Sequence, residues 1–241
     1  MDEKIQKLKE IIDGSDNIVF FGGAGVSTES GVPDFRSVDG LYNQEYDYPP
    51  ETILSHTFYK RNPEEFYRFY HNKMLFPDAK PNAAHKALAK LEQEGKLKAI
   101  GVSNFQIGDI ESLLETAEVK PMVNQILLHI SNTPLELVEY CQKRGIVVEA
   151  YSPIAHGEIL NQPEIKVIAD KYGVTIPQLC IRYTLQLGAI ALPKTADPEH
   201  MKSNAEVNFE ISAEDMEALK NFKKIENYGE SSGFPVYGGK L

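Results

Sequence analysis

The sequence predicts an α/β protein built on a mostly parallel, five-stranded sheet with flanking helices. The first observation is a series of short apolar runs that could form buried strands, at 18–22, 97–102, 122–128, 146–151 and 189–192. The second is that segments between these runs repeat apolar residues at helical spacing. Strands alternating with helices are typical of parallel sheets, because each return crossover carries a helix.

Composition limits the possible classes of protein. The chain has 241 residues, of which 42% are hydrophobic and 25% charged, which fits one large or two small globular domains. A net charge of -10 argues against nucleic acid as a partner. No apolar run is long enough to predict a membrane span, and the charged N-terminus does not resemble a secretory signal, so we expect a cytoplasmic protein.

The cysteine and histidine residues do not predict a metal site. Cys141 and Cys180 lie in apolar helical contexts, and we expect both to be buried free thiols. The six histidines are scattered, without the spacing that metal ligands show.

The first strongly patterned segment runs from a helix into a glycine-rich turn. Apolar spacing predicts a helix over 2–13, and the apolar run 17–21 predicts a strand buried on both faces. The strand leads into a glycine-rich turn over 22–31, an arrangement that can hold a phosphate against backbone N–H groups. The glycine spacing differs from the usual dinucleotide fingerprint, so a simple tight turn is an alternative.

The continuation of this turn carries a family resemblance. The segment 23–37 reads Gly-Ala-Gly-Val-Ser-Thr-Glu-Ser-Gly-Val-Pro-Asp-Phe-Arg-Ser, and Gly-Leu-Tyr follows at 40–42. Together with 81–92 it resembles the sirtuins, which are NAD-dependent protein deacylases. The resemblance covers about residues 1–100. It implies that Gly23, Ala24 and Gly25 line the pyrophosphate, and that Asp34, Phe35 and Arg36 belong to the loop closing over the nicotinamide ribose.

The sirtuin likeness stops before that family's catalytic parts. A sirtuin would continue with a catalytic histidine and two zinc-binding cysteine pairs, which this chain lacks. Deacylation needs the histidine as a general base. We therefore expect no deacylase activity.

A second resemblance begins where the first one ends. Gly101-Val-Ser-Asn-Phe105 resembles the fifth-strand motif of the aldo-keto reductases, and the likeness covers about residues 97–241. Periodicity in this region predicts helices at about 107–118, 134–144, 163–172, 177–187 and 213–223. Ser212 and Asp215 have the spacing of a cap for the last of these.

The reductase resemblance assigns roles to further residues. It implies that Ser103, Asn104 and Gln125 hydrogen-bond the nicotinamide carboxamide, and that Tyr151 stacks on the nicotinamide ring. The remaining matches are Lys194 and Thr195 for an adenosine 2′-phosphate and Asn204 for the adenine. His200 stands where many members have arginine, which weakens a preference for NADP.

The reductase catalytic tetrad comes from the half of the barrel that this chain does not match. Without its tyrosine acid, no group protonates a carbonyl oxygen as hydride arrives. We therefore assign no catalytic residues and expect a chain that is not an enzyme; if it is active, it should act as an NAD(P)-dependent oxidoreductase.

The two resemblances together predict a chimera, more naturally engineered than evolved. We expect a sirtuin-like Rossmann-type fragment over 1–96, with a helical insertion at about 43–76, joined to a half (β/α) barrel over 97–241. The two parts are expected to form one fused domain. The insertion could cover the open face of the half barrel, or two chains could pair as a homodimer; a doubly wound sheet is a third possibility.

Three functions remain open on this basis. The first is a chimera that binds NAD or NADP through partial sites without catalysis. The second is an active reductase-type oxidoreductase. The third is a folding scaffold without a ligand.

Overall fold

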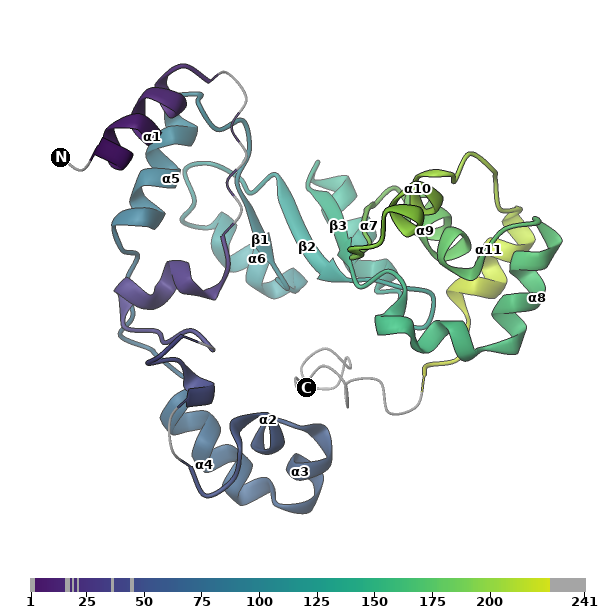
Figure 1. Ribbon diagram of the computed structural model, residues 1–241, viewed down its shortest axis with the longest axis horizontal. Helices are drawn as coiled ribbons and strands as arrows, with labels where there is room; N and C mark the ends of the chain where they lie inside the picture. The colour runs from purple at the N-terminus through teal and green to yellow at the C-terminus, as the bar shows by residue number, and fades with distance from the viewer. Residues whose placement is uncertain are drawn as a thin grey trace. The chain divides into compact units, whose positions relative to one another are not determined.

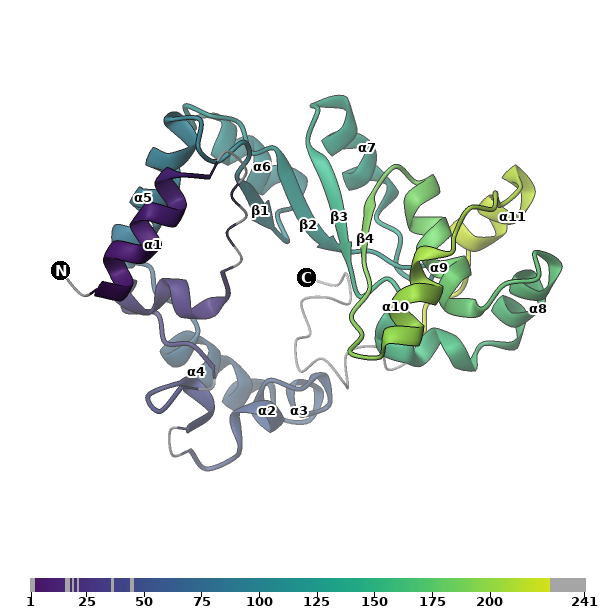
Figure 2. The ribbon, with the colours of Figure 1, turned by 45° about the horizontal axis from the view of Figure 1, so that its top comes forward.

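The computed structural model describes residues 3–15, 18, 20, 22–35, 37–43 and 46–225 (Figures 1 and 2). The chain divides after Ile100 into two compact units. Within the described residues, no helix is both long and apolar enough to cross a membrane.

The first unit is helical in the residues that the structure describes. Its elements are α1 (Glu3–Asp13), η1 (Ala24–Ser30), η2 (Leu41–Asn43), α2 (Pro50–Ile53), α3 (His56–Arg61), α4 (Pro63–Lys73) and α5 (Ala83–Gln93). Its core is a cluster of buried side chains on η2, α2 and α4, namely Leu41, Ile53, Leu54, Phe66 and Phe69. The aromatic residues of 50–75 therefore mainly build this core.

The second unit contains a four-stranded parallel sheet in the order β1-β2-β3-β4. The strands are β1 (Gly101–Ser103), β2 (Val123–Leu127), β3 (Val147–Tyr151) and β4 (Ile190–Leu192). The helical elements are α6 (Ile107–Leu114), α7 (Leu135–Lys143), η3 (Ala155–Asn161), α8 (Pro163–Lys171), α9 (Ile176–Gln186), α10 (Pro198–Ala205) and α11 (Ala213–Lys220). The order follows the sequence, as the alternation predicts.

The prediction of five strands was wrong, because the described residues form four. Of the expected first strand, Ile18, Phe20 and Gly22 are not in a strand, and the others lie outside the described residues. No Rossmann-type first unit is therefore found in the described part of the chain. β1 is also shorter than expected, since the backbone N–H of Ile100 donates to the Glu92 carboxylate at 3.0 Å and not to a strand. Ile100 therefore does not extend β1, because a strand is stable only where its backbone groups are paired with a neighbouring strand.

The two faces of the sheet differ in what covers them. Alternate residues of the strands, such as Ile126, Val148 and Ala150, pack against α6 and α7 in one buried cluster. The intervening residues point to the other face, which we call the open face. Apolar side chains on it remain accessible: Val147 is 43%, Ile190 46% and Leu192 38% exposed. Among the described residues, α6 and α7 therefore cover one face of the sheet, and these apolar side chains on the other face are accessible.

A second core lies between the helices that follow β3. It contains buried side chains from η3, α8, α9 and α11, including Ile159, Ile165, Leu179 and Tyr183. Cys180 lies in this core and Cys141 in the cluster behind the sheet, and both are buried free thiols as expected.

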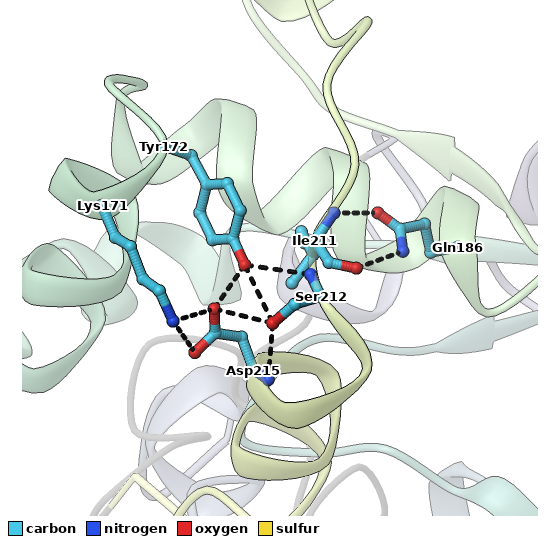
Figure 3. Close-up of polar contacts among 6 residues, drawn as sticks. All are labelled: Lys171, Tyr172, Gln186, Ile211, Ser212 and Asp215. Atoms are coloured by element: carbon cyan, nitrogen blue, oxygen red, sulfur yellow. Dashed lines mark hydrogen bonds and ion pairs between the residues drawn. The ribbon is translucent and has the colours of Figure 1, made fainter.

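A polar network fixes α11 against the end of α8 (Figure 3). Lys171 Nζ donates to both carboxylate oxygens of Asp215, at 3.0 and 2.7 Å, and the Tyr172 hydroxyl donates to the same carboxylate. Ser212 is the expected N-cap, and its hydroxyl accepts from the backbone N–H of Asp215 at 3.2 Å. The hydrogen bond from Lys171 is the main cause that lowers the pKa of Asp215, followed by the one from Tyr172.

Gly101→Ala should destabilise the protein by about 1–3 kcal/mol, because overpacking shifts the backbone. An added Cβ at this position would lie 2.7 Å from Val123 Cβ and 2.8 Å from the Val123 carbonyl oxygen. Urea unfolding measures the change. The matched control is Gly108→Ala in α6, where the space around an added Cβ is open and helix propensity favours alanine. Equal stability of the two variants would contradict the close packing of β1 on β2.

Asp215→Asn should lower the free energy of unfolding by about 1–3 kcal/mol, since it breaks a hydrogen-bonded network. The pKa of Asp215 lies below its ordinary value of 3.8 in the folded protein, so its contribution is complete above about pH 4. That contribution is lost as the pH falls through the lower folded value. Urea unfolding between pH 7 and pH 3 should therefore show a smaller acid loss in the variant. Asp170→Asn, which removes an exposed pair with Lys166, is the control.

Candidate functional site

The strands bring the predicted nicotinamide residues to the same edge of the sheet. Ser103 is paired with Gln125 across β1 and β2, and Asn104 directly follows β1. Tyr151, at the end of β3, is paired with Leu127 of β2 and Leu192 of β4. All strands are parallel, so their carboxyl ends lie together, where ligands bind in sheets of this kind.

Asn104 joins three strands at this edge. Its backbone has a φ of 58°, a left-handed conformation that asparagine tolerates better than most residues. Its N–H donates to the Gln125 carbonyl at 2.9 Å, which extends the pairing by one residue. Its side-chain Oδ1 accepts from the Tyr151 hydroxyl at 3.0 Å. The left-handed turn thus directs the Asn104 amide across β2 to the end of β3.

Ser103 and Gln125 are tied to the same network. The Ser103 hydroxyl donates to the Gln125 carbonyl at 3.1 Å. The Gln125 amide donates through Nε2 to the Glu149 carboxylate at 2.9 Å, and these two residues are paired in register on β2 and β3. Ser103, Gln125, Glu149 and Tyr151 therefore share the open face, because residues in register in a parallel sheet point to the same side.

A shallow hollow adjoins this cluster at the outer edge of β1. Side chains of the β1–α6 segment line it, namely Ser103, Asn104, Phe105, Asp109, Ser112, Leu113 and Thr116. The lining offers hydroxyl, amide and carboxylate groups, so the edge of the sheet is rich in hydrogen-bonding groups.

The loops after β2 and β3 place two histidines near each other. His129 is 1% exposed, and its Nδ1 lies 3.1 Å from the Ser131 hydroxyl. Burial, together with the nearby His156, lowers the pKa of His129 to about 3. The Nε2 atom of His156 lies 3.2 Å from the Ser152 hydroxyl oxygen. His129 is therefore neutral at physiological pH and behaves as a polar core residue.

The residues predicted for the adenosine end lie after β4. Lys194 is exposed, and the Thr195 hydroxyl accepts from the Asp197 N–H at 3.1 Å just before α10. Asn204 lies half-buried on the last turn of α10. Within the described residues, no carboxylate lies within ion-pair distance of Lys194. The pairing of β3 with β4 links this segment to the cluster that contains Ser103, Gln125 and Tyr151.

The sirtuin-like residues lie in the first unit. Gly23, Ala24 and Gly25 form the exposed start of η1, and an added Cβ at either glycine would meet nothing within 4 Å. Neither glycine has a positive φ, so neither packing nor backbone conformation within the described residues requires it. The Asp34 carboxylate accepts from the Ser37 N–H at 2.8 Å, and Phe35 packs on Tyr42. Arg36 lies outside the described residues.

The comparisons with known proteins agree with the geometry of the second unit. The model of the aldo/keto reductase family matches residues 53–224. The chain belongs to this family. The crystal structure of an aldo-keto reductase complexed with NADPH superposes with a TM-score of 0.55 and 30% sequence identity, over 65% of this chain and 52% of that one.

Curated relatives confirm both resemblances. An NAD-dependent protein deacetylase of Clostridium perfringens is 62% identical over 107 residues, which are 44% of this chain and 44% of that protein. The glyoxal reductase of Bacillus subtilis is 41% identical over 145 residues, 60% of this chain and 52% of that protein. The chain thus spans about half the length of the curated relatives it matches, and it is similar to two families at once.

The hydrogen-bonding groups at this edge of the sheet are of the kinds that can bind a nicotinamide dinucleotide. A hydroxyl, two amides and a phenol lie in one hydrogen-bonded cluster, and apolar side chains continue on the same face. Glu149 is a site residue that the sequence reasoning missed. Period-two alternation places it on the face of Tyr151, and that signal could have identified it.

The ring of His129 should show no protonation between pH 7 and pH 5 when followed by NMR, because burial lowers its pKa to about 3. In the unfolded chain, histidine binds a proton below about pH 6.5. Stability should therefore fall below that pH by about 1.4 kcal/mol per pH unit from this residue alone. His129→Gln should reduce this slope in urea unfolding at pH 7 and pH 5. A ring that protonates near pH 6.5 would contradict the buried placement.

Proposed function

We propose that this protein is an NAD(P)H-dependent oxidoreductase of the aldo/keto reductase type, whose second unit binds the dinucleotide. The observation that carries the proposal is the hydrogen-bonded cluster of Ser103, Asn104, Gln125 and Tyr151 at the carboxyl edge of β1–β3. These residues come from three separate stretches of the sequence. Family membership and the NADPH-bound structural relative support the same conclusion.

The residues of the cluster have distinct tasks. The Ser103 hydroxyl and the amides of Asn104 and Gln125 hold the nicotinamide carboxamide, and the Tyr151 ring provides a surface for the nicotinamide. When bound, the reduced dinucleotide would supply a hydride to a carbonyl carbon, and the proton for the carbonyl oxygen would come from water, because the cluster contains no residue assigned as an acid. Ile190 and Leu192 offer apolar surface on the same open face, which favours exclusion of water from the reacting region.

The adenosine end supports NADP(H) as the cofactor. The exposed Lys194 has no carboxylate partner within the described residues, so its charge is available to a 2′-phosphate. Thr195 adds a hydroxyl beside it, and Asn204 on α10 adds an amide for the adenine. NAD remains the cofactor for which the glycine loop of the first unit, with Gly23 and Gly25, would be suited.

Binding without turnover is the second candidate. The phenol at this edge, Tyr151, donates its hydrogen to Asn104, so it holds the cluster together and does not act as an acid on a substrate. In that case the chain would be a fusion of two dinucleotide-binding fragments. It would retain binding in its reductase-like part but catalyse neither parent reaction.

Lys194→Ala should weaken NADPH binding about tenfold or more and leave NADH binding within about twofold. A charge-assisted hydrogen bond contributes about 1.5–3 kcal/mol, and NADH lacks the 2′-phosphate. Calorimetric titration of the full chain with each dinucleotide measures both affinities. The control is Lys143→Ala on α7, which removes an exposed lysine paired with Glu139.

The same protein should then be incubated with NADPH and glyoxal, the substrate in the name of one relative. Glyoxal-dependent loss of NADPH absorbance supports the oxidoreductase. Saturable binding without that loss supports the second candidate. If no dinucleotide binds, both candidates are contradicted and the folding scaffold remains.

A further inference from the structure

Glu149 lies at the centre of β3, and its carboxylate is hydrogen-bonded to a side chain of the polar cluster. It is paired in register with Gln125, and its Oε2 accepts from Gln125 Nε2 at 2.9 Å. It is half-buried and shares the open face with Tyr151, two residues further along the strand. Its neighbour in register on β4 is Ile190, so apolar surface borders it on the other side.

This contact determines the orientation of the Gln125 amide. An ionised carboxylate can only accept hydrogen bonds, so the NH₂ group of Gln125 must face it. The carbonyl oxygen Oε1 then points away from Glu149. An acceptor in that position matches the NH₂ of a carboxamide, whereas the flipped amide would present a donor.

The charge of Glu149 is not neutralised locally. Among the described residues, no lysine, arginine or histidine lies within ion-pair distance of its carboxylate. A half-buried charge is screened less by salt than one on the surface. The nicotinamide ring is positively charged when oxidised and neutral when reduced, so a nearby carboxylate interacts differently with the two forms.

We propose that Glu149 is a positioning residue for Gln125 and that its charge makes the site bind the oxidised dinucleotide preferentially over the reduced one. The proposal rests on the proposed binding of the nicotinamide by Gln125. It assigns a role to a residue that neither family resemblance identifies. The consequence is a redox-state preference set by one side chain of β3.

The test compares the affinities of NADP⁺ and NADPH in the full chain and its variants by calorimetry. Glu149→Gln retains an oxygen that can accept from Gln125 but removes the charge. It should weaken NADP⁺ binding about fivefold more than NADPH binding, because any loss of the Gln125 orientation affects the two forms equally. A factor of this size is expected for unit charges about 8 Å apart at an effective dielectric constant of about 40. Glu149→Ala also removes the acceptor, so it should weaken both forms.

Two controls separate this role from a general structural one. Adenosine 2′,5′-bisphosphate lacks the nicotinamide, and its affinity should not change in either Glu149 variant. Glu139→Gln on α7 removes an exposed carboxylate paired with Lys143 and should leave the affinity ratio of the two dinucleotides unchanged. Circular dichroism and urea unfolding establish that each variant is folded before its affinities are compared.

The outcomes are distinct. A change in the NADP⁺ to NADPH affinity ratio that is confined to the Glu149 variants supports the proposal. If both forms bind the wild-type chain and Glu149→Gln leaves the ratio unchanged, the role of Glu149 is overturned while the proposed function stands. If neither form binds the wild-type chain, the proposed function and this inference are both overturned.

Discussion

The in-register parallel pairing of β1 to β4 is the constraint on which the candidate site depends. Pairing of Ser103 with Gln125 and of Gln125 with Glu149 places three side chains in one row across the sheet. The pleat then puts that row on the open face. A shift of one residue in either pair would turn those side chains toward α6 and α7. Burying the polar row there would be unfavourable, because that side of the sheet is packed mainly with apolar residues and its polar Asn124 is hydrogen-bonded to the Phe105 carbonyl.

The close approach of β1 to β2 makes this register possible. Gly101 faces Val123 with no room for a side chain, so a glycine is required at the start of β1. At the other end of the strand, Asn104 adopts a left-handed conformation and closes the ladder with a hydrogen bond to Gln125. The short motif from Gly101 to Asn104 therefore combines a packing requirement, a backbone turn and two polar groups. These residues are therefore explained by the fold itself, independently of any ligand.

The loop after β3 shares the unusual backbone found after β1. Ser152, Ala155 and His156 all have φ values near 50°, in the left-handed region that residues with a Cβ rarely occupy. Such conformations cost free energy and persist only where surrounding structure holds them. Here Ala155 is buried in the helical core, and the Ser152 hydroxyl is close to His156. Backbone strain is thus concentrated at the carboxyl edge of the sheet, beside the polar cluster, which is where function and strain commonly coincide.

The sequence by itself determined most elements of the second unit and the order of its strands. Apolar periodicity identified β2, β3 and β4 and the helices α6, α7, α8, α9 and α11, because a residue that must be buried recurs at the spacing of its element. It also identified the Ser212 cap, which is a local interaction. It predicted a fifth strand that the described residues do not form. An apolar run such as 17–21 has the same pattern whether or not a partner strand exists. The sequence analysis missed α10. Its start carries a cap signal, Asp197 followed by Pro198, but the helix has no buried residues that would produce an apolar period.

Only the tertiary structure decided which polar groups meet. The resemblance named Ser103, Asn104, Gln125 and Tyr151 separately, and the pairing of three strands joined them by hydrogen bonds. Local alternation places Glu149 on the face of Tyr151, but only the pairing brings its carboxylate to Gln125 and orients the Gln125 amide. The physical reason is that hydrogen bonds between strands join residues 22 to 47 positions apart, and their geometry depends on register and twist. Local sequence sets which elements form, and their packing sets what those elements can bind.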